Sequence, residues 1–249
     1  MTMAEGGGEW EKGTSGPVMS RAAFTERFFE LEENSDLFGF RVRNQAIWDY
    51  LRYPIFRILL DLLVQRNEIN YRSTKKPRYA RELRHMVPVA LRCLWHRVSP
   101  KKYDLIFVNY ERKQDIAGKK GNVHFLPLAS ALSHRYRILL LDPSTYDEPV
   151  DSVYPCDVFS SRVLHHRASL GAYLVRYTEK EQEIVSQIHD ILIEAFDVRL
   201  DMKTLVRTAF SYQLRLFEEY KKLFAWTRPS VALCCDTGSY KGWMAAAHE

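Results

Sequence analysis

Three clusters of polar residues carry the side chains of this 249-residue chain that are best suited to chemistry. Each cluster follows an apolar run, and the three occupy residues 109–113, 142–145 and 236–241. A carboxylate can act as a general base when a substrate hydroxyl lies within hydrogen-bond reach, and a nearby cation can offset phosphate charge. The candidate catalytic residues are Glu111, Asp142 and Asp236. The candidate substrate-binding residues are Tyr110, Arg112, Gly238, Tyr240 and Lys241.

The two aspartates also have a purely structural interpretation. Asp commonly occupies turns and helix caps, and Asp142 and Asp236 each stand where a turn is expected. For either residue alone, the cap or turn role is the stronger interpretation. The three clusters together favour a binding site, because open parallel sheets bind ligands beyond the carboxyl ends of their strands.

The elements that must position these clusters are short apolar runs separated by a loop and a helix. Residues 104–109 and 136–142 each contain a continuous apolar run, and between them lie a polar loop at 110–122 and a helical segment at 125–134. Such runs suit parallel strands that are covered on both faces. A further strand is expected at 230–236. The predicted fold class is α/β, a Rossmann-like open parallel sheet flanked by helices, with a helical N-terminal extension.

Hydrophobic periodicity divides the chain into three regions. Residues 1–20 are a polar, glycine-rich tail, 21–100 a helical and basic region, and 101–249 the α/β domain. Pro54 is expected to kink or divide a helix over 43–65. Apolar stripes predict two more helices within 179–224, separated near 197–201.

A short strand over 157–164 is expected to lead into His165 and His166. Adjacent side chains on a strand point to opposite faces. The two imidazoles are therefore not expected to chelate one metal, and no metal site is predicted.

Positive charge is concentrated in residues 66–102, where eleven Lys and Arg residues stand against two acids. This charge favours an anionic partner such as a phosphate, a nucleic acid or an anionic membrane surface. Within it, residues 82–98 form a basic amphipathic segment, which either lies in a lipid interface or packs its apolar face on the core. The candidate membrane-facing residues are Arg84, Arg92, Trp95 and Arg97.

The chain lacks the sequence motifs of several nucleotide-binding and enzyme classes. The chain has no P-loop pattern, no Gly-x-Gly-x-x-Gly after a strand, and no Gly-x-Ser-x-Gly or zincin motif. Its four cysteines form no Cys-x-x-Cys pair, which favours a reducing compartment. No signal peptide or transmembrane helix is recognisable, so the expected location is cytoplasmic, with peripheral contact to the inner face of the plasma membrane.

One passage carries a family resemblance. The run Trp226-x-Arg228-Pro229-Ser230-Val231-Ala232-Leu233, followed by Ala245-Ala246-Ala247, resembles a passage in bacterial surface-polysaccharide glycosyltransferases. In those enzymes an Arg-Pro-x-Val strand opens the last βα unit of the amino-terminal half. Residues 48–56 and 103–106 look similar too, so the resemblance touches most of residues 40–249 in short patterns.

The resemblance implies a GT-B architecture of two Rossmann-like domains, in which the amino-terminal domain handles the acceptor. It implies a glycan or lipid-linked glycan acceptor, no bound metal and no cofactor on this half. The donor nucleotide sugar would bind a carboxyl-terminal domain, which this sequence does not contain. The chain is therefore expected to be a fragment or one half of a split enzyme, and to be inactive alone.

The alternative is a non-enzymatic α/β module that binds nucleic acid or another polyanion through its basic block. It ranks below the transferase half, because the chain has no recognisable nucleic-acid-binding module.

Overall fold

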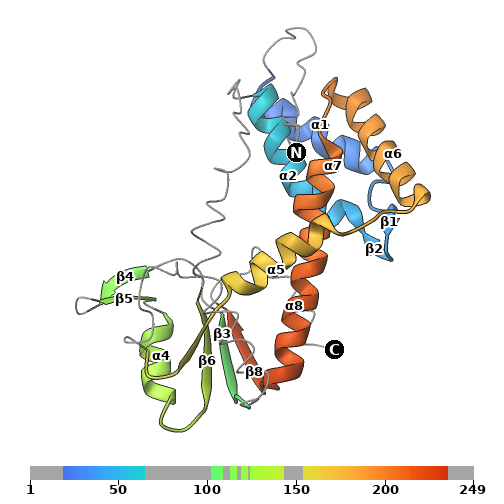
Figure 1. Ribbon diagram of the computed structural model, residues 1–249. Helices are drawn as coiled ribbons and strands as arrows, with labels where there is room; N and C mark the ends of the chain where they lie inside the picture. Colours follow the sequence, from blue (N-terminus) through green and yellow to red (C-terminus); the bar gives the residue numbers. More distant parts are fainter. Residues whose placement is uncertain are drawn as a thin grey trace, which may run out of the picture. The chain divides into compact units, whose positions relative to one another are not determined.

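The computed structural model describes residues 19–64, 102–108, 124–142 and 154–234, together with the backbone of 113–116 and 119–122. The chain divides into two compact units. The helical unit comprises Met1–Thr74 and Ala172–Gln213, and the α/β unit comprises Lys75–Gly171 and Leu214–Glu249. Each unit is described by itself (Figure 1).

The α/β unit is built on a parallel sheet of four strands among the described residues. The strands are β3 (Leu105–Val108), β6 (Ile138–Asp142), β7 (Asp157–Ser160) and β8 (Val231–Cys234). Their order is β7-β6-β3-β8, and every neighbouring pair is parallel (Figure 1). The predicted α/β fold class with an open parallel sheet is confirmed.

Continuous apolar strands form this sheet because both of its faces are covered. All five residues of β6 are buried. On one face, Phe107 stacks on Phe125 of α4 (Phe125–Leu132), with ring centroids 5.1 Å apart. On the other face, Phe159 borders a small hollow with side chains of α5 (Arg162–Tyr173) and α8 (Tyr212–Thr227). Helices on both faces of a parallel sheet are the expected arrangement for this architecture.

The helical unit packs its apolar faces around a cluster of aromatic rings. Its elements are α1 (Arg21–Asn34), β1 (Arg41–Val42), β2 (Gln45–Ala46), α2 (Ile47–Leu63), α6 (Glu179–Phe196), α7 (Met202–Leu205) and η2 (Val206–Ser211), a π-helix. The ring of Phe56 lies 5.1 Å from those of Phe24 and Phe28, which are fully or almost fully buried. Phe196 of α6 contacts the same two rings, so the cluster joins α1, α2 and α6.

Local signals explain where these elements begin and turn. Thr178 and Glu181 form a capping box at the start of α6. Strands β1 and β2 are joined by the two-residue turn Arg43-Asn44, with φ values of 53° and 62°. A two-residue hairpin turn of this kind requires positive φ at both positions, and Asn tolerates that conformation well.

Four features differ from the sequence-based expectations. Helix α2 runs on through Pro54, so the division that was one of the two outcomes expected there does not occur. Residues 110–122, predicted as a loop, contain the antiparallel hairpin of β4 (Lys113–Ile116) and β5 (Lys119–Asn122). Its strands are too polar to give a strand pattern.

The third difference concerns the histidine pair. His165 and His166 lie in helix α5, not on a strand, because β7 ends at Ser160. The argument that a strand sends the two imidazoles to opposite faces is therefore wrong.

The fourth difference concerns the division of the chain. The sequence analysis assigned all of 101–249 to the α/β domain, whereas Ala172–Gln213 belongs to the helical unit. Packing explains this, since Phe196 joins the aromatic cluster of α1 and α2 and Tyr50 of α2 contacts Phe210.

Candidate functional site

The carboxyl edge of the sheet contains the point at which strand order reverses. Strand β3 comes first in the chain, β6 and then β7 add on one side of it, and β8 adds on the other. In open α/β sheets, ligands bind in the crevice outside such a switch point. Val108 and Cys234, the last residues of β3 and β8, are register partners. The switch point therefore lies beyond these two residues.

Most of the predicted site residues lie outside the part of the chain that the structure describes. Segment 109–113 directly follows β3 in the sequence, and segment 236–241 begins two residues after the end of β8. The undescribed residues are Tyr110, Glu111, Arg112, Asp236, Gly238, Tyr240 and Lys241, and also Arg84, Arg92, Trp95 and Arg97. Of the candidates, Asp142 alone lies among the described residues.

Asp142 is the last residue of β6, and its side chain is fully buried. Its backbone carbonyl accepts a hydrogen bond from the backbone N–H of Ser161 at 3.0 Å. Its register partner on β7 is Ser160. The backbone of Asp142 is therefore hydrogen-bonded to the turn that begins α5. The residues directly after Asp142 lie outside the described part of the chain, so the turn role expected for its side chain stays a prediction.

The turn after β7 brings further polar groups to the same edge. Ser161 is 3% exposed, and the Oγ of Ser160 is buried with no hydrogen-bond partner among the described residues. The carbonyl of Ser161 accepts from the backbone N–H groups of Leu164 and His165 at 3.0 and 3.2 Å, which starts α5. The amino end of a helix carries partial positive charge, so this turn favours an acceptor group nearby.

His165 lies in the first turn of α5 and is held neutral. Burial, with smaller contributions from His166 and Arg162, lowers its pKa from 6.5 to about 4. At neutral pH its imidazole is therefore an uncharged group beside the carboxyl edge. Within the described residues, no three His, Cys, Asp or Glu side chains gather in a way that could hold a metal ion.

Sequence reasoning missed Ser160, Ser161 and His165 as residues of this edge. It extended the strand to Leu164 because Val163 and Leu164 are apolar. The signal that could have found the turn is the Ser-Ser pair directly after the apolar run, since Ser favours helix starts.

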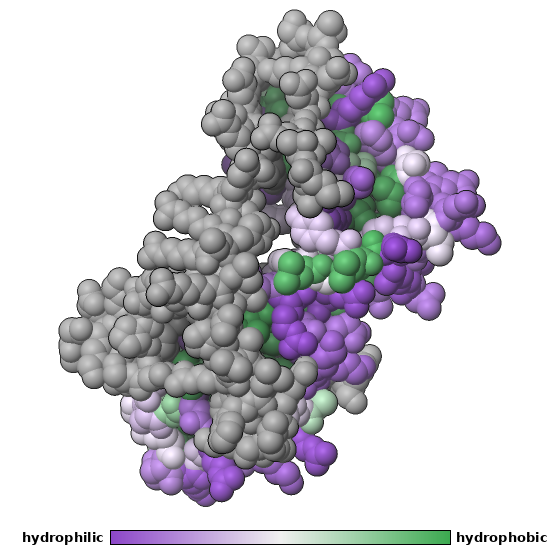
Figure 2. Space-filling model, in the orientation of Figure 1, coloured by the Kyte–Doolittle hydropathy of each residue, from purple (hydrophilic) through white to green (hydrophobic). Residues whose placement is uncertain are grey.

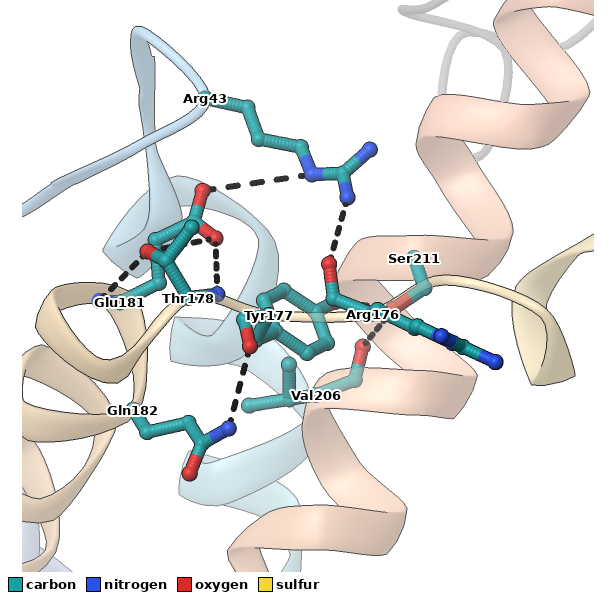
Figure 3. A network of polar contacts seen from close by, with 8 residues as sticks. All are labelled: Arg43, Arg176, Tyr177, Thr178, Glu181, Gln182, Val206 and Ser211. Atoms are coloured by element: carbon teal, nitrogen blue, oxygen red, sulfur yellow. Dashed lines mark hydrogen bonds and ion pairs between the residues drawn. The ribbon is translucent and has the colours of Figure 1, made fainter.

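A second polar cluster, shown in Figure 3, lies within the helical unit. The hydroxyls of Tyr177 and Ser211 are hydrogen-bonded, and the Ser211 hydroxyl also lies 3.2 Å from the carbonyl oxygen of Val206. The Ser211 hydroxyl therefore serves the widened turn of the π-helix η2. Burial is the main reason that the pKa of Tyr177 is raised.

The turn residue Arg43 completes this network. Its guanidinium donates to the carbonyl oxygen of Arg176 at 2.8 Å and lies 5.8 Å from the ring centre of Tyr177. Its Nε is 4.0 Å from a carboxylate oxygen of Glu181 (Figure 3). These groups bind one another across the hairpin, the start of α6 and η2. The network therefore stabilises the packing of the helical unit.

On the side drawn in Figure 2, the described residues form no broad apolar area. The described residues there are mostly hydrophilic, with apolar residues in small groups. None of the described helices is both long enough and apolar enough to cross a bilayer.

Comparisons with models of protein families, with curated proteins and with solved structures found no match. The fold and the geometry of the sheet edge therefore carry the functional argument.

Proposed function

We propose that this chain is the acceptor-side half of a nucleotide-sugar-dependent glycosyltransferase of cell-surface polysaccharide biosynthesis. Its acceptor would be a glycan or a lipid-linked glycan at the cytoplasmic face of the membrane. The donor nucleotide sugar would be held by a separate carboxyl-terminal domain. This half alone would not catalyse transfer, because catalysis requires both reactants to be held in one geometry.

The observation that carries the proposal is the switch point between β3 and β8. Two of the three polar segments predicted to bind substrate follow these strands, and Asp142 ends the neighbouring β6. A Rossmann-like sheet whose strands are followed in the sequence by Asp, Glu, Arg and Lys residues suits a hydroxyl-bearing, phosphate-bearing acceptor.

The local structure of the resemblance passage supports the same proposal. Helix α8 ends at Thr227, Arg228 takes a φ of 48°, and β8 begins at Val231. The Arg-Pro-x-Val passage therefore leads a strand into the sheet, as the corresponding passage does in the glycosyltransferases that it resembles. That strand is one of the two that border the switch point.

Burial separates Asp142 from the other two acidic candidates. The side chain of Asp142 has no exposed surface, so we do not assign it the role of general base. Glu111 and Asp236 follow the two strands of the switch point and are the proposed candidates for the general base. Arg112 and Lys241 would offset phosphate charge on the acceptor.

The proposal is tested by acceptor binding and turnover with the purified chain. A lipid-linked diphosphate glycan should bind, and Glu111→Gln and Asp236→Asn should each weaken binding about tenfold, as expected for loss of a charged hydrogen bond worth about 1.4 kcal/mol. The matched control is Asp190→Asn, an exposed residue of α6 in the helical unit. Equal affinities in all three variants would remove the switch point as the acceptor site.

Turnover tests the other part of the proposal. With nucleotide sugars and acceptor present, the isolated chain should give no sugar transfer. Efficient transfer by this chain alone would show that it is not an acceptor-side half.

A further inference from the structure

A second hollow lies at the opposite, amino edge of the same sheet. Its volume is about 420 Å³, which is within the range of about 300–1,000 Å³ that is typical of small-molecule sites. It is bordered by residues that precede or begin β3, β6 and β7 and by the end of α4. The lining residues are Lys102, Tyr103, Ser133, Tyr136, Arg137, Ile138, Pro155, Cys156 and Asp157. All of them belong to the α/β unit.

One carboxylate, that of Asp157, lines this hollow. Tyr103 is 4% exposed, and its hydroxyl donates to Oδ2 of Asp157 at 2.9 Å. Burial, helped by Asp157, raises the pKa of Tyr103 and raises that of Cys156 to about 11. Both groups are therefore protonated at neutral pH. Asp157 offers a carboxylate held in place by a phenol.

The mouth of the hollow carries two cations, Lys102 and Arg137, and both side chains are exposed. Hydrogen bonds hold both the backbone N–H and the backbone carbonyl of Arg137. Its N–H donates to Oδ2 of Asp104 at 2.8 Å, and its carbonyl accepts from the N–H groups of Asp104 and Leu105 at 2.9 and 3.2 Å. The guanidinium is therefore attached to a rigid part of the sheet edge, and the lining holds two cations against one carboxylate.

We propose that this hollow binds a small phosphorylated polyol, such as a sugar phosphate. Lys102 and Arg137 take the phosphate, for which guanidinium and ammonium donors are well suited. The hydroxyls of Ser133 and Tyr136 and the carboxylate of Asp157 face the polyol hydroxyls. The site is separate from the switch point, because parallel strands place their amino and carboxyl ends at opposite edges of a sheet.

The first experiment is calorimetric titration of the full chain at low salt with ribose 5-phosphate, ribose and inorganic phosphate as probes. Ribose 5-phosphate should bind, and it should bind at least about tenfold more tightly than either ribose or phosphate. Arg137→Gln and Lys102→Gln should each lower its affinity about five- to tenfold. Lys180→Gln, an exposed charge change in the helical unit, should leave the affinity unchanged.

The second experiment places the ligand by cysteine labelling, followed by mass spectrometry that resolves each cysteine. Ribose 5-phosphate should slow alkylation of Cys156, which lines the hollow, and should not slow alkylation of Cys234 at the end of β8. Unchanged alkylation of Cys156 at saturating ligand would overturn the site. Phosphate binding as tightly as ribose 5-phosphate would overturn the polyol assignment. Either result would leave the acceptor-binding test at Glu111 and Asp236 unaffected.

Discussion

Two buried polar groups, the carboxylate of Glu32 in the helical unit and the hydroxyl of Ser160 at the sheet edge of the α/β unit, differ in their hydrogen-bond partners. In the helical unit, the carboxylate of Glu32, 8% exposed, accepts from the indole N–H of Trp48 at 2.7 Å and from Arg52 at 2.6 Å. In the α/β unit, the Oγ of Ser160 is buried at the carboxyl edge without a hydrogen-bond partner among the described residues. Saturated polar groups stabilise a fold, whereas a buried group without a partner costs free energy.

The two kinds of polar group therefore have different expected effects on stability. The polar contacts of Glu32 and of Ser211 join helices and serve stability. The hydroxyl of Ser160 makes no such contact among the described residues and contributes less to stability. Substitutions at these groups therefore have different expected effects on the free energy of unfolding.

The largest loss of stability is expected for Glu32→Ala. The fully buried indole N–H of Trp48 would lose its acceptor, and a small cavity would remain, for a cost of about 2–3 kcal/mol in the free energy of unfolding. Arg52 is 43% exposed, so loss of its ion pair adds little. Denaturant unfolding of Glu32→Ala and of the exposed control Glu33→Ala measures the effect. Equal stabilities of the two variants would contradict a structural role for Glu32.

A pH dependence of stability is expected from His165. Its folded-state pKa is about 4, below the unfolded value of about 6.5, so the unfolded chain takes up the proton first as the pH falls. Its stabilising contribution is therefore complete above about pH 6.5 and is lost progressively as the pH falls towards 4. We expect a loss of about 2 kcal/mol over this window, allowing for partial exposure of the ring.

Unfolding measured at several pH values between 7.5 and 4 checks this expectation for His165. The variant His165→Gln should flatten the dependence, and the exposed control His134→Gln should not. An unchanged slope in His165→Gln would show that other groups cause the acid sensitivity.

The network of Figure 3 predicts a coupled effect at the π-helix. Ser211→Ala removes the hydroxyl that serves Val206 and Tyr177, which should cost about 1.5 kcal/mol, and Tyr177→Phe should cost about 1 kcal/mol. Because the two hydroxyls contact each other, the double variant should cost less than the sum. Ser186→Ala on the exposed face of α6 is the control. Strict additivity would show that the two hydroxyls act independently.

The smallest effect is expected for Ser160→Ala at the sheet edge. The buried hydroxyl lacks a hydrogen-bond partner among the described residues, so its removal should change stability by no more than about 0.5 kcal/mol, and in the stabilising direction. Thermal and denaturant unfolding measure this directly against Ser211→Ala. A loss above about 1 kcal/mol would remove the distinction between the Ser160 and Ser211 hydroxyls.

Local patterns predicted the apolar strands of the parallel sheet well, and the polar hairpin and the turns less well. The apolar runs at 104–109, 136–142 and 230–236 are found as β3, β6 and β8. The start of α5 was missed because Val163 and Leu164 continue an apolar run whose strand has already ended at Ser160. The π-helix was missed because one inserted residue in a helical turn leaves no mark on hydrophobic periodicity. At the carboxyl edge, Asp142 was foreseen from its place after a strand, whereas Ser160 and His165 were not.

By itself, the sequence determined the types of element, because apolar periodicity, the Thr178 capping box and the Arg43-Asn44 turn act within about ten residues. Only the tertiary structure decided that β8 lies beside β3 and that Ala172–Gln213 packs with the N-terminal helices. The physical reason is that the strand pairing and the helix packing both depend on apolar surfaces that are far apart in the sequence and meet only when the chain folds. The pairing of Val108 with Cys234 creates the switch point, and no local pattern near either residue encodes it.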